Sequence, residues 1–307
     1  RRMVRDPAEP SPRRLAALEA LTRPAPWQRR AAAEFAGVAR RGPDHGLLPE
    51  HLTLSPSQAD SYLSCPRRYA LERRLLVEAG STQYLEFGSL VHEVLERAEA
   101  AALDRSDAHA ELDEALEMLD RVFDPAAFGG APWSDAWHAK AVRILTHLYD
   151  RWPGKGRVAA VEHWVEADLH GITWRGRIDR VEAIGEEPDV ALRIIDYKTG
   201  TSHPTLPEAA VSPQLGFYLI AARQDPSLTA LGAPQVAELW YPAVRTKNVT
   251  VRKLDPGKLD EVAARLGEAA EGIAAEDWTP RTNDHCTRCA VRLVCPEWPE
   301  GREAYQG

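Results

Sequence analysis

The sequence predicts an α/β fold in which a mixed central sheet has helices on both faces. Three observations support this prediction. Between residues 55 and 149, apolar residues recur at the spacing of amphipathic helices. After Pro153-Gly154 the pattern changes to strand-like alternation. Helical and strand patterns then follow each other in turn up to residue 275. A chain that mixes these patterns buries one face of each helix against a shared sheet.

The first well-defined helix is expected to begin after Ser55. Ser55 can cap the helix, Pro56 suits its first position, and Gln58 completes a capping box. Cys65-Pro66 then interrupts the helix, and Arg67–Leu76 resumes it with a basic stripe. A second helix is expected over Glu86–Ala102, with apolar residues and His92 on one side, followed by helices in the acidic segment Glu93–Asp124 and over Trp137–Tyr149.

A β-hairpin is predicted in the middle of the chain. Val158–Leu169 and Ile172–Ile184 both alternate, and His170-Gly171 forms the turn between them. Val190–Tyr197 is a short, mostly apolar strand that leads into Asp-Tyr-Lys-Thr-Gly. The elements expected after it are a helix over Pro213–Arg223, strands over Val236–Tyr241 and Val249–Arg252, a helix over Pro256–Ala275, and an irregular tail with three cysteines.

Composition excludes several other classes of protein. The 307 residues carry a net charge of -8, with 44% hydrophobic and 27% charged residues, which is typical of a folded globular protein and not of a disordered one. No run approaches the roughly 18 apolar residues that a membrane-spanning helix needs. Four cysteines are too few to cross-link a secreted chain of this length, so a reducing, cytoplasmic location is expected.

The chain is expected to have two parts. Residues 1–50 begin without Met, are rich in Arg, Ala and Pro, and carry a local charge of +4, as expected for a connector or lead-in from a preceding domain. Residues 51–307 contain the strong helix and strand patterns and are predicted to form the folded domain.

Two carboxylates and a lysine stand out among the predicted strands. Asp196 and Lys198 are two residues apart at the end of a strand, so their side chains leave the same face. Asp179 lies between Ile178 and Val181, near the end of the second hairpin strand. Converging carboxylates beside a lysine suit a hard divalent ion, Mg²⁺ or Mn²⁺. Taken singly, each carboxylate could equally belong to a surface ion pair.

Several motifs in one order resemble the RecB family of PD-(D/E)XK nucleases. They lie within residues 52–298 and comprise Leu54-Ser55-Pro56-Ser57, Cys65-Pro66-Arg67-Arg68-Tyr69, Phe87-Gly88-Ser89-Leu90-Val91-His92, Gly176-Arg177-Ile178-Asp179-Arg180, Ile194-Ile195-Asp196-Tyr197-Lys198-Thr199-Gly200 and Gln214-Leu215-Gly216-Phe217-Tyr218. The resemblance implies a restriction-endonuclease-like core that hydrolyses DNA phosphodiester bonds with a divalent metal ion.

The resemblance also implies roles for individual residues. Asp179, Asp196, His92 and the backbone carbonyl of Tyr197 would hold the metal ion; Lys198 would act in catalysis together with Asp179 and Asp196; Gln214 and Tyr218 would face the site and the DNA. Arg67, Arg68 and Arg177 are candidate phosphate contacts, although the stripe at Arg67–Arg74 could also be a solvated face. Glu162 is a candidate for the family's first acidic position, but a solvent-facing strand glutamate explains it equally well.

The four cysteines form a candidate metal site. Cys286, Cys289 and Cys295 are close together, and Cys65 lies 221 residues before the first of them. Four thiolates suit either zinc or an iron–sulfur cluster, and spacing alone favours zinc. The resemblance instead implies a [4Fe–4S] cluster, an iron–sulfur staple that joins the N-terminal helix to the C-terminal tail.

The lead-in and the Arg- and Ala-rich composition resemble more closely the C-terminal nuclease module of an actinobacterial AdnAB-type helicase–nuclease. This implies an ATP-driven helicase domain in the same parent polypeptide, a second helicase–nuclease subunit, and a role in resecting DNA double-strand breaks, with single strands and duplex ends as substrates. Two alternatives remain open. A stand-alone exonuclease of the CRISPR-adaptation type shares the cysteine pattern, and a catalytically inactive scaffold would bind DNA ends without cutting them.

Overall fold

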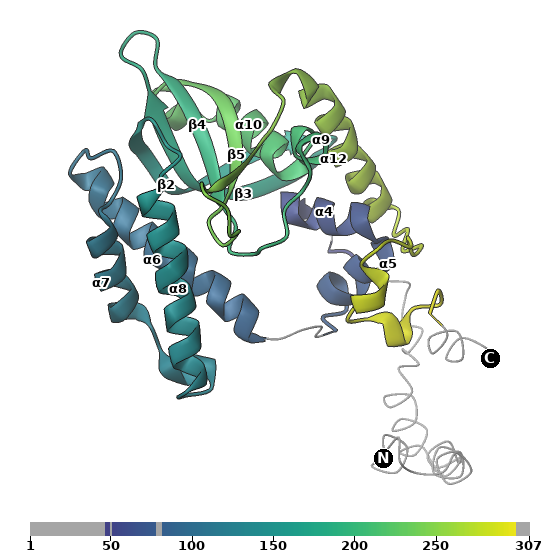
Figure 1. Cartoon of the computed structure of the whole chain (residues 1–307). Coiled ribbons are helices and arrows are strands. Elements are labelled where there is room, and N and C mark those ends of the chain that lie inside the picture. Colours follow the sequence, from purple (N-terminus) through teal and green to yellow (C-terminus); the bar gives the residue numbers. More distant parts are fainter. Residues whose placement is uncertain (1–46, 50, 78–81, 299–307) are drawn as a thin grey trace, which may run out of the picture. The chain divides into compact units, whose positions relative to one another are not determined.

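The computed structural model describes residues 47–49, 51–77 and 82–298 (Figure 1). The chain divides into two units, Arg1–Leu48 and Pro49–Gly307, and the fold below is that of the second unit. The expected connector over residues 1–50 lies almost entirely outside the described residues, so its role stays a prediction.

Six strands form one mixed sheet, and the sequence patterns predict five of them. They are β1 (Thr53–Leu54), β2 (Arg157–Leu169), β3 (Ile172–Ile184), β4 (Ala191–Tyr197), β5 (Ala233–Tyr241) and β6 (Thr250–Lys253). The order is β1-β3-β4-β5-β6, and β2 pairs with β3 as the predicted hairpin. The pairs β1–β3 and β4–β5 are parallel, and the other pairs are antiparallel. The sequence pattern missed β1 because two residues are too few for an alternation to be recognised.

The helices of the domain begin and end close to the predicted positions. The longer ones are α4 (Pro56–Ser64), α6 (Thr82–Asp104), α7 (Leu112–Val122), α8 (Trp133–Asp150), α10 (Pro213–Gln224) and α12 (Leu259–Ala274). Shorter helical segments are α5 (Pro66–Tyr69), a π-helical turn at Ala70–Arg74, α9 (Leu206–Ala210) and α11 (Pro226–Thr229). At the start of α4, Ser55 and Gln58 form the expected capping box.

Helices cover both faces of the sheet, which confirms the predicted α/β architecture. Figure 1 shows α6, α7 and α8 together on one side, and α4, α10 and α12 pack against one another on the other. Because side chains alternate along β4, Ile195 and Tyr197 join the core beneath α6 and α8. Asp196 therefore points toward the opposite face, which α10 covers.

A buried charged network connects α6 to the sheet next to Asp179. The Arg180 side chain is fully buried and forms ion pairs with Glu99 of α6 and Glu182 of β3. Tyr149 of α8 donates a hydrogen bond of 2.7 Å to Glu99. Buried charges persist only when they are paired and hydrogen-bonded, so this network holds α6 and α8 in place against β3.

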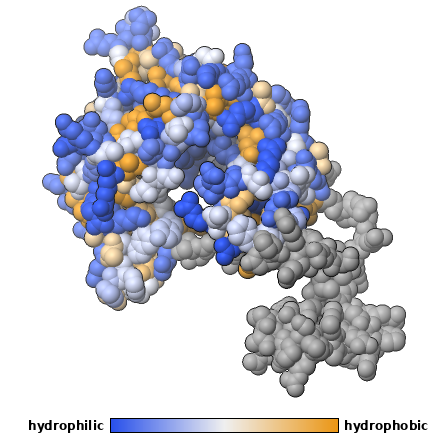
Figure 2. All heavy atoms as spheres, turned by 45° about the vertical axis from the view of Figure 1, so that its right-hand side comes forward, coloured by the Kyte–Doolittle hydropathy of each residue, from blue (hydrophilic) through white to orange (hydrophobic). Residues whose placement is uncertain are grey.

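The face of the molecule drawn in Figure 2 is mostly polar. Figure 2 shows hydrophilic residues over most of the described part of this face, with apolar residues in smaller patches between them. No helix in the described ranges combines the length and the apolarity that a bilayer crossing requires.

Candidate metal centre

Three carboxylates lie side by side on neighbouring strands. Arg180 of β3 pairs with Ile195 of β4 in an antiparallel register. The next position along this register places Asp179 opposite Asp196. On the other side of β3, Glu162 of β2 lies opposite Asp179, because the two neighbours of Glu162 pair with the two neighbours of Asp179. Directly opposed residues project from the same face with Cβ atoms about 4.5–5.5 Å apart. The sheet thus forms a row of three acidic side chains with Asp179 at its centre.

Glu162 turns toward this row through an unusual backbone conformation. Its φ is 49°, a left-handed value that is rare for a residue inside a strand. Its side chain is only 10% exposed. The interpretation of Glu162 as a solvent-facing strand residue is therefore wrong, because the kink at this position directs the carboxylate inward.

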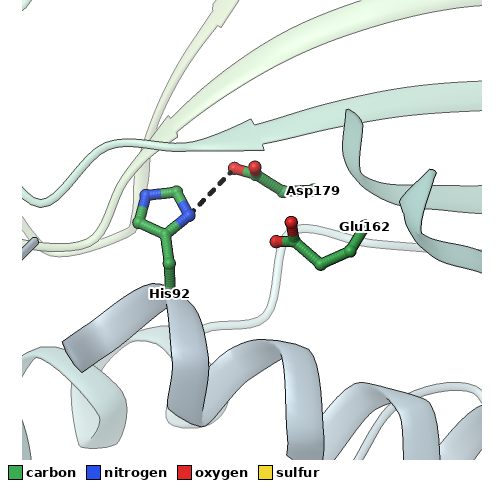
Figure 3. A group of neighbouring side chains, drawn as sticks. All are labelled: His92, Glu162 and Asp179. Atoms are coloured by element: carbon green, nitrogen blue, oxygen red, sulfur yellow. Dashed lines mark ion pairs between the residues drawn. The ribbon is translucent and has the colours of Figure 1, made fainter. Parts of the chain in front are cut away.

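His92 from α6 completes a group that can hold a cation. Its Nδ1 lies 3.5 Å from Oδ2 of Asp179, and one ligand atom each from His92, Glu162 and Asp179 lie within 4.8 Å of one another (Figure 3). In Figure 3 the imidazole rises from the helix toward Asp179, and the Glu162 carboxylate approaches from the other side. Oxygen and imidazole nitrogen together suit Mg²⁺ and especially Mn²⁺.

The third carboxylate is held by residues predicted for the site. Asp196 is 3% exposed, and its Oδ2 lies 2.6 Å from Nζ of Lys198. Gln214 on α10 donates a hydrogen bond of 2.7 Å to Oδ1 of Asp196 and another of 3.2 Å to the Tyr218 hydroxyl. Gln214 and Tyr218 both line the cleft, and Gln214 contacts the acidic row directly.

Tyr197 joins the centre through its backbone. It follows Asp196 at the end of β4, and its N–H donates a hydrogen bond of 2.6 Å to Oδ2 of Asp179. Coordination of a metal ion by the Tyr197 carbonyl stays a prediction.

Burial of so many acidic groups raises their pKa values. Burial, reinforced by the Asp179 charge, raises the pKa of Glu162 from 4.5 to about 7. Burial likewise raises the pKa of Asp196 from 3.8 to about 6, although the Lys198 ammonium opposes this. Burial favours the neutral form of His92, but the hydrogen bond and charge of Asp179 outweigh it and raise the His92 pKa. Beside burial, the negative charge of Asp179 raises the pKa of all three neighbours, and a divalent cation would offset that charge.

The residues present fit such a cation. Oε2 of Glu162 lies 2.6 Å from Nε of Arg177, and Oδ2 of Asp196 lies 2.6 Å from Nζ of Lys198. Beside these two cations, the ligand atoms of Glu162, Asp179 and His92 lie close enough together to share one divalent ion. Figure 3 shows the Glu162 oxygens directed into the space between Asp179 and His92.

The centre opens into a cleft of about 770 Å³. Arg177 lines it, with its Nε 2.6 Å from Oε2 of Glu162 and its guanidinium 5.7 Å from the centre of the Trp164 ring. The Trp164 side chain is 64% exposed at the same cleft. Arg67 and Arg68, the other candidate phosphate contacts, do not line this cleft but a separate cavity.

That separate cavity, of about 120 Å³, brings the four cysteines together. Cys65 lies at the end of α4, and Cys286, Cys289 and Cys295 lie in the C-terminal turns; all four line the cavity and none is in a disulfide. Asn283 ties the two segments together, since its side chain donates a hydrogen bond of 3.0 Å to the carbonyl of Ser64. No three of these sulfurs lie within 4.8 Å of one another.

Comparison with known proteins supplies independent information. The sequence model of the PD-(D/E)XK nuclease superfamily matches residues 53–296. The chain is 26% identical over 276 residues to the Gene 69 protein of Mycobacterium phage D29, covering 79% of this chain and 96% of that protein.

Two larger bacterial proteins are also similar, and both are subunits of an ATP-dependent helicase/deoxyribonuclease. The chain is 25% identical over 239 residues to the one from Clostridium kluyveri, and 25% identical over 199 residues to the one from Lachnoclostridium phytofermentans. These matches cover 66% and 58% of this chain, but only 21% and 17% of the two larger proteins. A solved structure from Eubacterium rectale described as an exonuclease covers 77% of this chain and 87% of its own, with 14% identity and a TM-score of 0.43.

Proposed function

Because the chain belongs to the PD-(D/E)XK nuclease superfamily, we propose that it is a metal-dependent DNA nuclease whose centre is the acidic row Glu162, Asp179 and Asp196. The observation that carries the proposal is the alignment of the three carboxylates across β2, β3 and β4, with His92 on one side and Lys198 on the other.

Each residue of the centre has a distinct task in this proposal. Asp179, Glu162 and His92 hold the divalent ion, together with Asp196 and the Tyr197 carbonyl. The bound ion supplies positive charge against a phosphate and acidifies water. Lys198 is held charged by Asp196, since the charge and hydrogen bond of that carboxylate outweigh burial and raise the Lys198 pKa. Lys198 therefore remains positive and can hold the attacking water and the phosphate charge.

Gln214 is proposed to position Asp196 rather than to touch the reacting atoms. Its amide donates to Asp196 and to Tyr218, so the Gln214–Tyr218 pair fixes the carboxylate from the α10 side. Arg177 and Trp164 at the cleft are proposed to contact the nucleic acid, as a cation for phosphate and an exposed ring on which a base can stack.

For the parent protein, we propose the nuclease module of a helicase–nuclease that resects double-strand breaks, of the actinobacterial AdnAB type. Similarity to two helicase/deoxyribonuclease subunits, of which this chain spans about a fifth, supports the idea. A motor domain and a second subunit would then be partners. A stand-alone exonuclease is the second candidate, because the chain covers 96% of the phage protein, which leaves almost none of that protein for a motor domain.

For the cysteines, we propose a [4Fe–4S] cluster. A tetrahedral zinc ion with Zn–S bonds of about 2.3 Å needs its sulfurs roughly 3.8 Å apart. The cysteines surround a cavity, and no three of their sulfurs lie within 4.8 Å, which suits a larger cluster better than a single zinc ion. The ligands would be Cys65, Cys286, Cys289 and Cys295, which would hold the cluster between α4 and the C-terminal turns.

A cleavage assay tests the central proposal. End-labelled single-stranded and duplex DNA would be incubated with the full chain and Mg²⁺, Mn²⁺ or chelator, with the Asp179→Asn variant as the matched control. Metal-dependent cleavage that the variant lacks is the expected result. Metal-dependent binding of DNA ends without cleavage would identify the inactive scaffold instead, and equal cleavage by the variant would exclude this centre.

A further inference from the structure

A second cavity, of about 410 Å³, lies between α8 and the loop that connects β5 to β6. Three cationic side chains line it, Lys140 and Arg143 from α8 and Arg245 from the loop, and no carboxylate does. Lys247 is exposed two residues further along the same loop. In a chain with a net charge of -8, the wall of this cavity is therefore locally positive.

These cations are not neutralised within the described part of the chain. Elsewhere, surface arginines have acidic partners: Arg97 pairs with Glu93, and Arg121 with Glu117. Arg143, Arg245 and Lys247 form no ion pair with any described residue. A surface that keeps its charges unpaired favours an anionic ligand.

The ammonium of Lys140 is held at the cavity by attraction to aromatic ring faces. Its Nζ lies 4.3 Å from the centre of the Phe87 ring and 4.7 Å from that of Trp137. Burial, followed by the nearby Arg143 charge, lowers the Lys140 pKa. Two cations held close together without a counter-charge repel each other, and a bound phosphate would remove that repulsion.

The cavity adjoins the edge of the sheet at which the metal centre lies. β4 and β5 are parallel and end together, and the N–H of Lys198 donates a hydrogen bond of 2.8 Å to the carbonyl of Trp240. The segments that follow these two strands supply Thr201 and Pro242 to the cavity wall. The cavity therefore begins only three residues beyond Lys198.

The helix that carries His92 connects the two sites from the other side. Lys140 packs on Phe87, which precedes Gly88, and Gly88 lies one helical turn before His92 and lines the metal cleft. A Cβ atom added at Gly88 would lie 3.5 Å from Oγ1 of Thr199, so α6 and the segment after Lys198 are close there. The cleft and the basic cavity thus flank the same pair of segments.

We propose that Lys140, Arg143, Arg245 and Lys247 bind the phosphate backbone of the DNA strand on the side of the metal centre opposite the cleft with Trp164. This inference rests on the proposed nuclease function and extends it, because it defines a path for one strand: past Trp164 and Arg177, across the acidic row, and over the basic cavity. An acidic protein partner would also fit the charge. Continuity with the catalytic edge favours the strand, since a cut strand must leave the centre there.

The path also explains how an acidic domain engages DNA. Arg177 in the cleft is already paired with Glu162, so the cleft has less free positive charge than its arginines suggest. The acidic row repels a phosphate until a metal ion is bound. Unpaired cations next to the row would hold the strand by its phosphates without sequence preference.

The test measures binding separately from cleavage. In the Asp179→Asn background, Arg143→Glu/Arg245→Glu would be compared with Arg121→Glu/Arg151→Glu. This second double variant has the same change in net charge at residues that line neither the metal cleft nor the basic cavity. The probe is fluorescent single-stranded oligothymidylate of about 20 nucleotides, long enough to cover both sites, titrated over a range of salt concentrations in chelator.

We expect the Arg143/Arg245 variant to lose at least about 10-fold in affinity, and its salt slope to fall by about 1.4, or roughly 0.7 for each lost phosphate contact. The Arg121/Arg151 control should keep both its affinity and its salt slope. Should the glutamate variant fail to fold, as judged by circular dichroism, Arg143→Gln/Arg245→Gln is expected to change the slope in the same direction.

The possible outcomes separate this inference from the function on which it rests. Equal losses in the two double variants would mean that only net charge matters and would overturn the inference. The inference is also overturned if neither double variant loses affinity for the oligonucleotide. If the chain that retains Asp179 then cuts DNA, the nuclease function still stands. If the chain with Asp179 restored neither binds nor cuts DNA, both proposals fail.

Discussion

The backbone N–H of Tyr197 donates a hydrogen bond of 2.6 Å to Oδ2 of Asp179, the same oxygen that lies 3.5 Å from His92. This bond connects the β3 carboxylate to the end of β4, one residue after Asp196. It therefore fixes Asp179 between a strand end and a helix while leaving its other oxygen available. A centre built on such a contact keeps its geometry when no cation is present, which reduces the reorganisation needed for binding.

Asp179→Asn and Asp196→Asn should each reduce metal-dependent DNA cleavage by more than the roughly 10–100-fold typical of residues that only support a metal ligand. Asparagine preserves size but removes the charge that binds the cation. Thermal stability should stay the same or rise, because one member of a repelling acidic row becomes neutral. Initial cleavage rates and melting temperatures measure the two effects.

Asp168→Asn is the matched control for these variants, since Asp168 lies at the end of the hairpin and accepts a hydrogen bond from Thr173. It should cleave DNA like the unsubstituted chain. Normal cleavage by Asp179→Asn or Asp196→Asn would show that the acidic row is not the catalytic centre.

Lys198→Met should abolish most cleavage but leave the metal affinity within a few-fold of normal. The methionine retains the length of the side chain while removing the ammonium, which is the group proposed to act on water and phosphate. Titration of Mn²⁺ by calorimetry separates binding from chemistry. Loss of metal affinity would instead assign Lys198 to holding Asp196 in place, and Lys155→Met, at the start of the hairpin, provides the control.

Gln214→Ala should weaken divalent-metal binding about 10-fold, within the range usual for partners that orient a ligand. The cause is the loss of the 2.7 Å hydrogen bond to Asp196. The fall in cleavage should be largely recovered at high metal concentration, which distinguishes a positioning residue from one that acts in the chemistry. A cleavage defect that persists at saturating Mn²⁺ would contradict this role.

Sequence patterns predicted most of the sheet and helices because the β-hairpin and the amphipathic helices have strong periodicity. The register of the hairpin could also have identified Glu162 as a residue of the site. Counting back from the two-residue turn at His170-Gly171 places Glu162 directly opposite Asp179, a relationship that register alone implies. What sequence could not supply is the left-handed backbone at Glu162, which depends on the local kink rather than on residue type.

Contacts between distant segments were the harder part. The basic cavity combines Lys140 with Arg245, more than a hundred residues later, and neither residue belongs to a recognisable motif. Arg67 and Arg68 line the cysteine cavity and not the metal cleft, so their contacts with phosphate stay a prediction. Charge in a sequence does not reveal which surface it will line.

Stability at low pH should depend on Asp225. Burial would raise its pKa, but hydrogen bonds from Ser227, His163 and the N–H of Leu228 outweigh burial and lower it from 3.8 to about 2. Since the folded-state pKa lies below the ordinary value, the carboxylate stabilises the fold fully above pH 3.8, and the contribution disappears as pH falls toward 2.

The Asp225→Asn variant measures this contribution. It should lower the free energy of unfolding by on the order of 1 kcal/mol at pH 6, because the pair with His163 is partly exposed and screened. The difference from the unsubstituted chain should shrink when denaturation is repeated at pH 3. A difference that is the same at both pH values would mean that charge on Asp225 is irrelevant.

The purified chain should be brown and contain about four iron and four sulfide ions, if the cysteine cavity holds the proposed cluster. Cys65→Ser and Cys286→Ser should lose the visible absorption and unfold at lower temperature. The cluster would close a loop of more than two hundred residues, and removing such a link costs on the order of 5 kcal/mol when treated like a long disulfide loop. Ser64→Ala, next to Cys65, should keep both colour and stability. A colourless chain with one zinc ion would replace the cluster with a tetrahedral thiolate site and require the sulfurs to move closer together than they lie around the cavity.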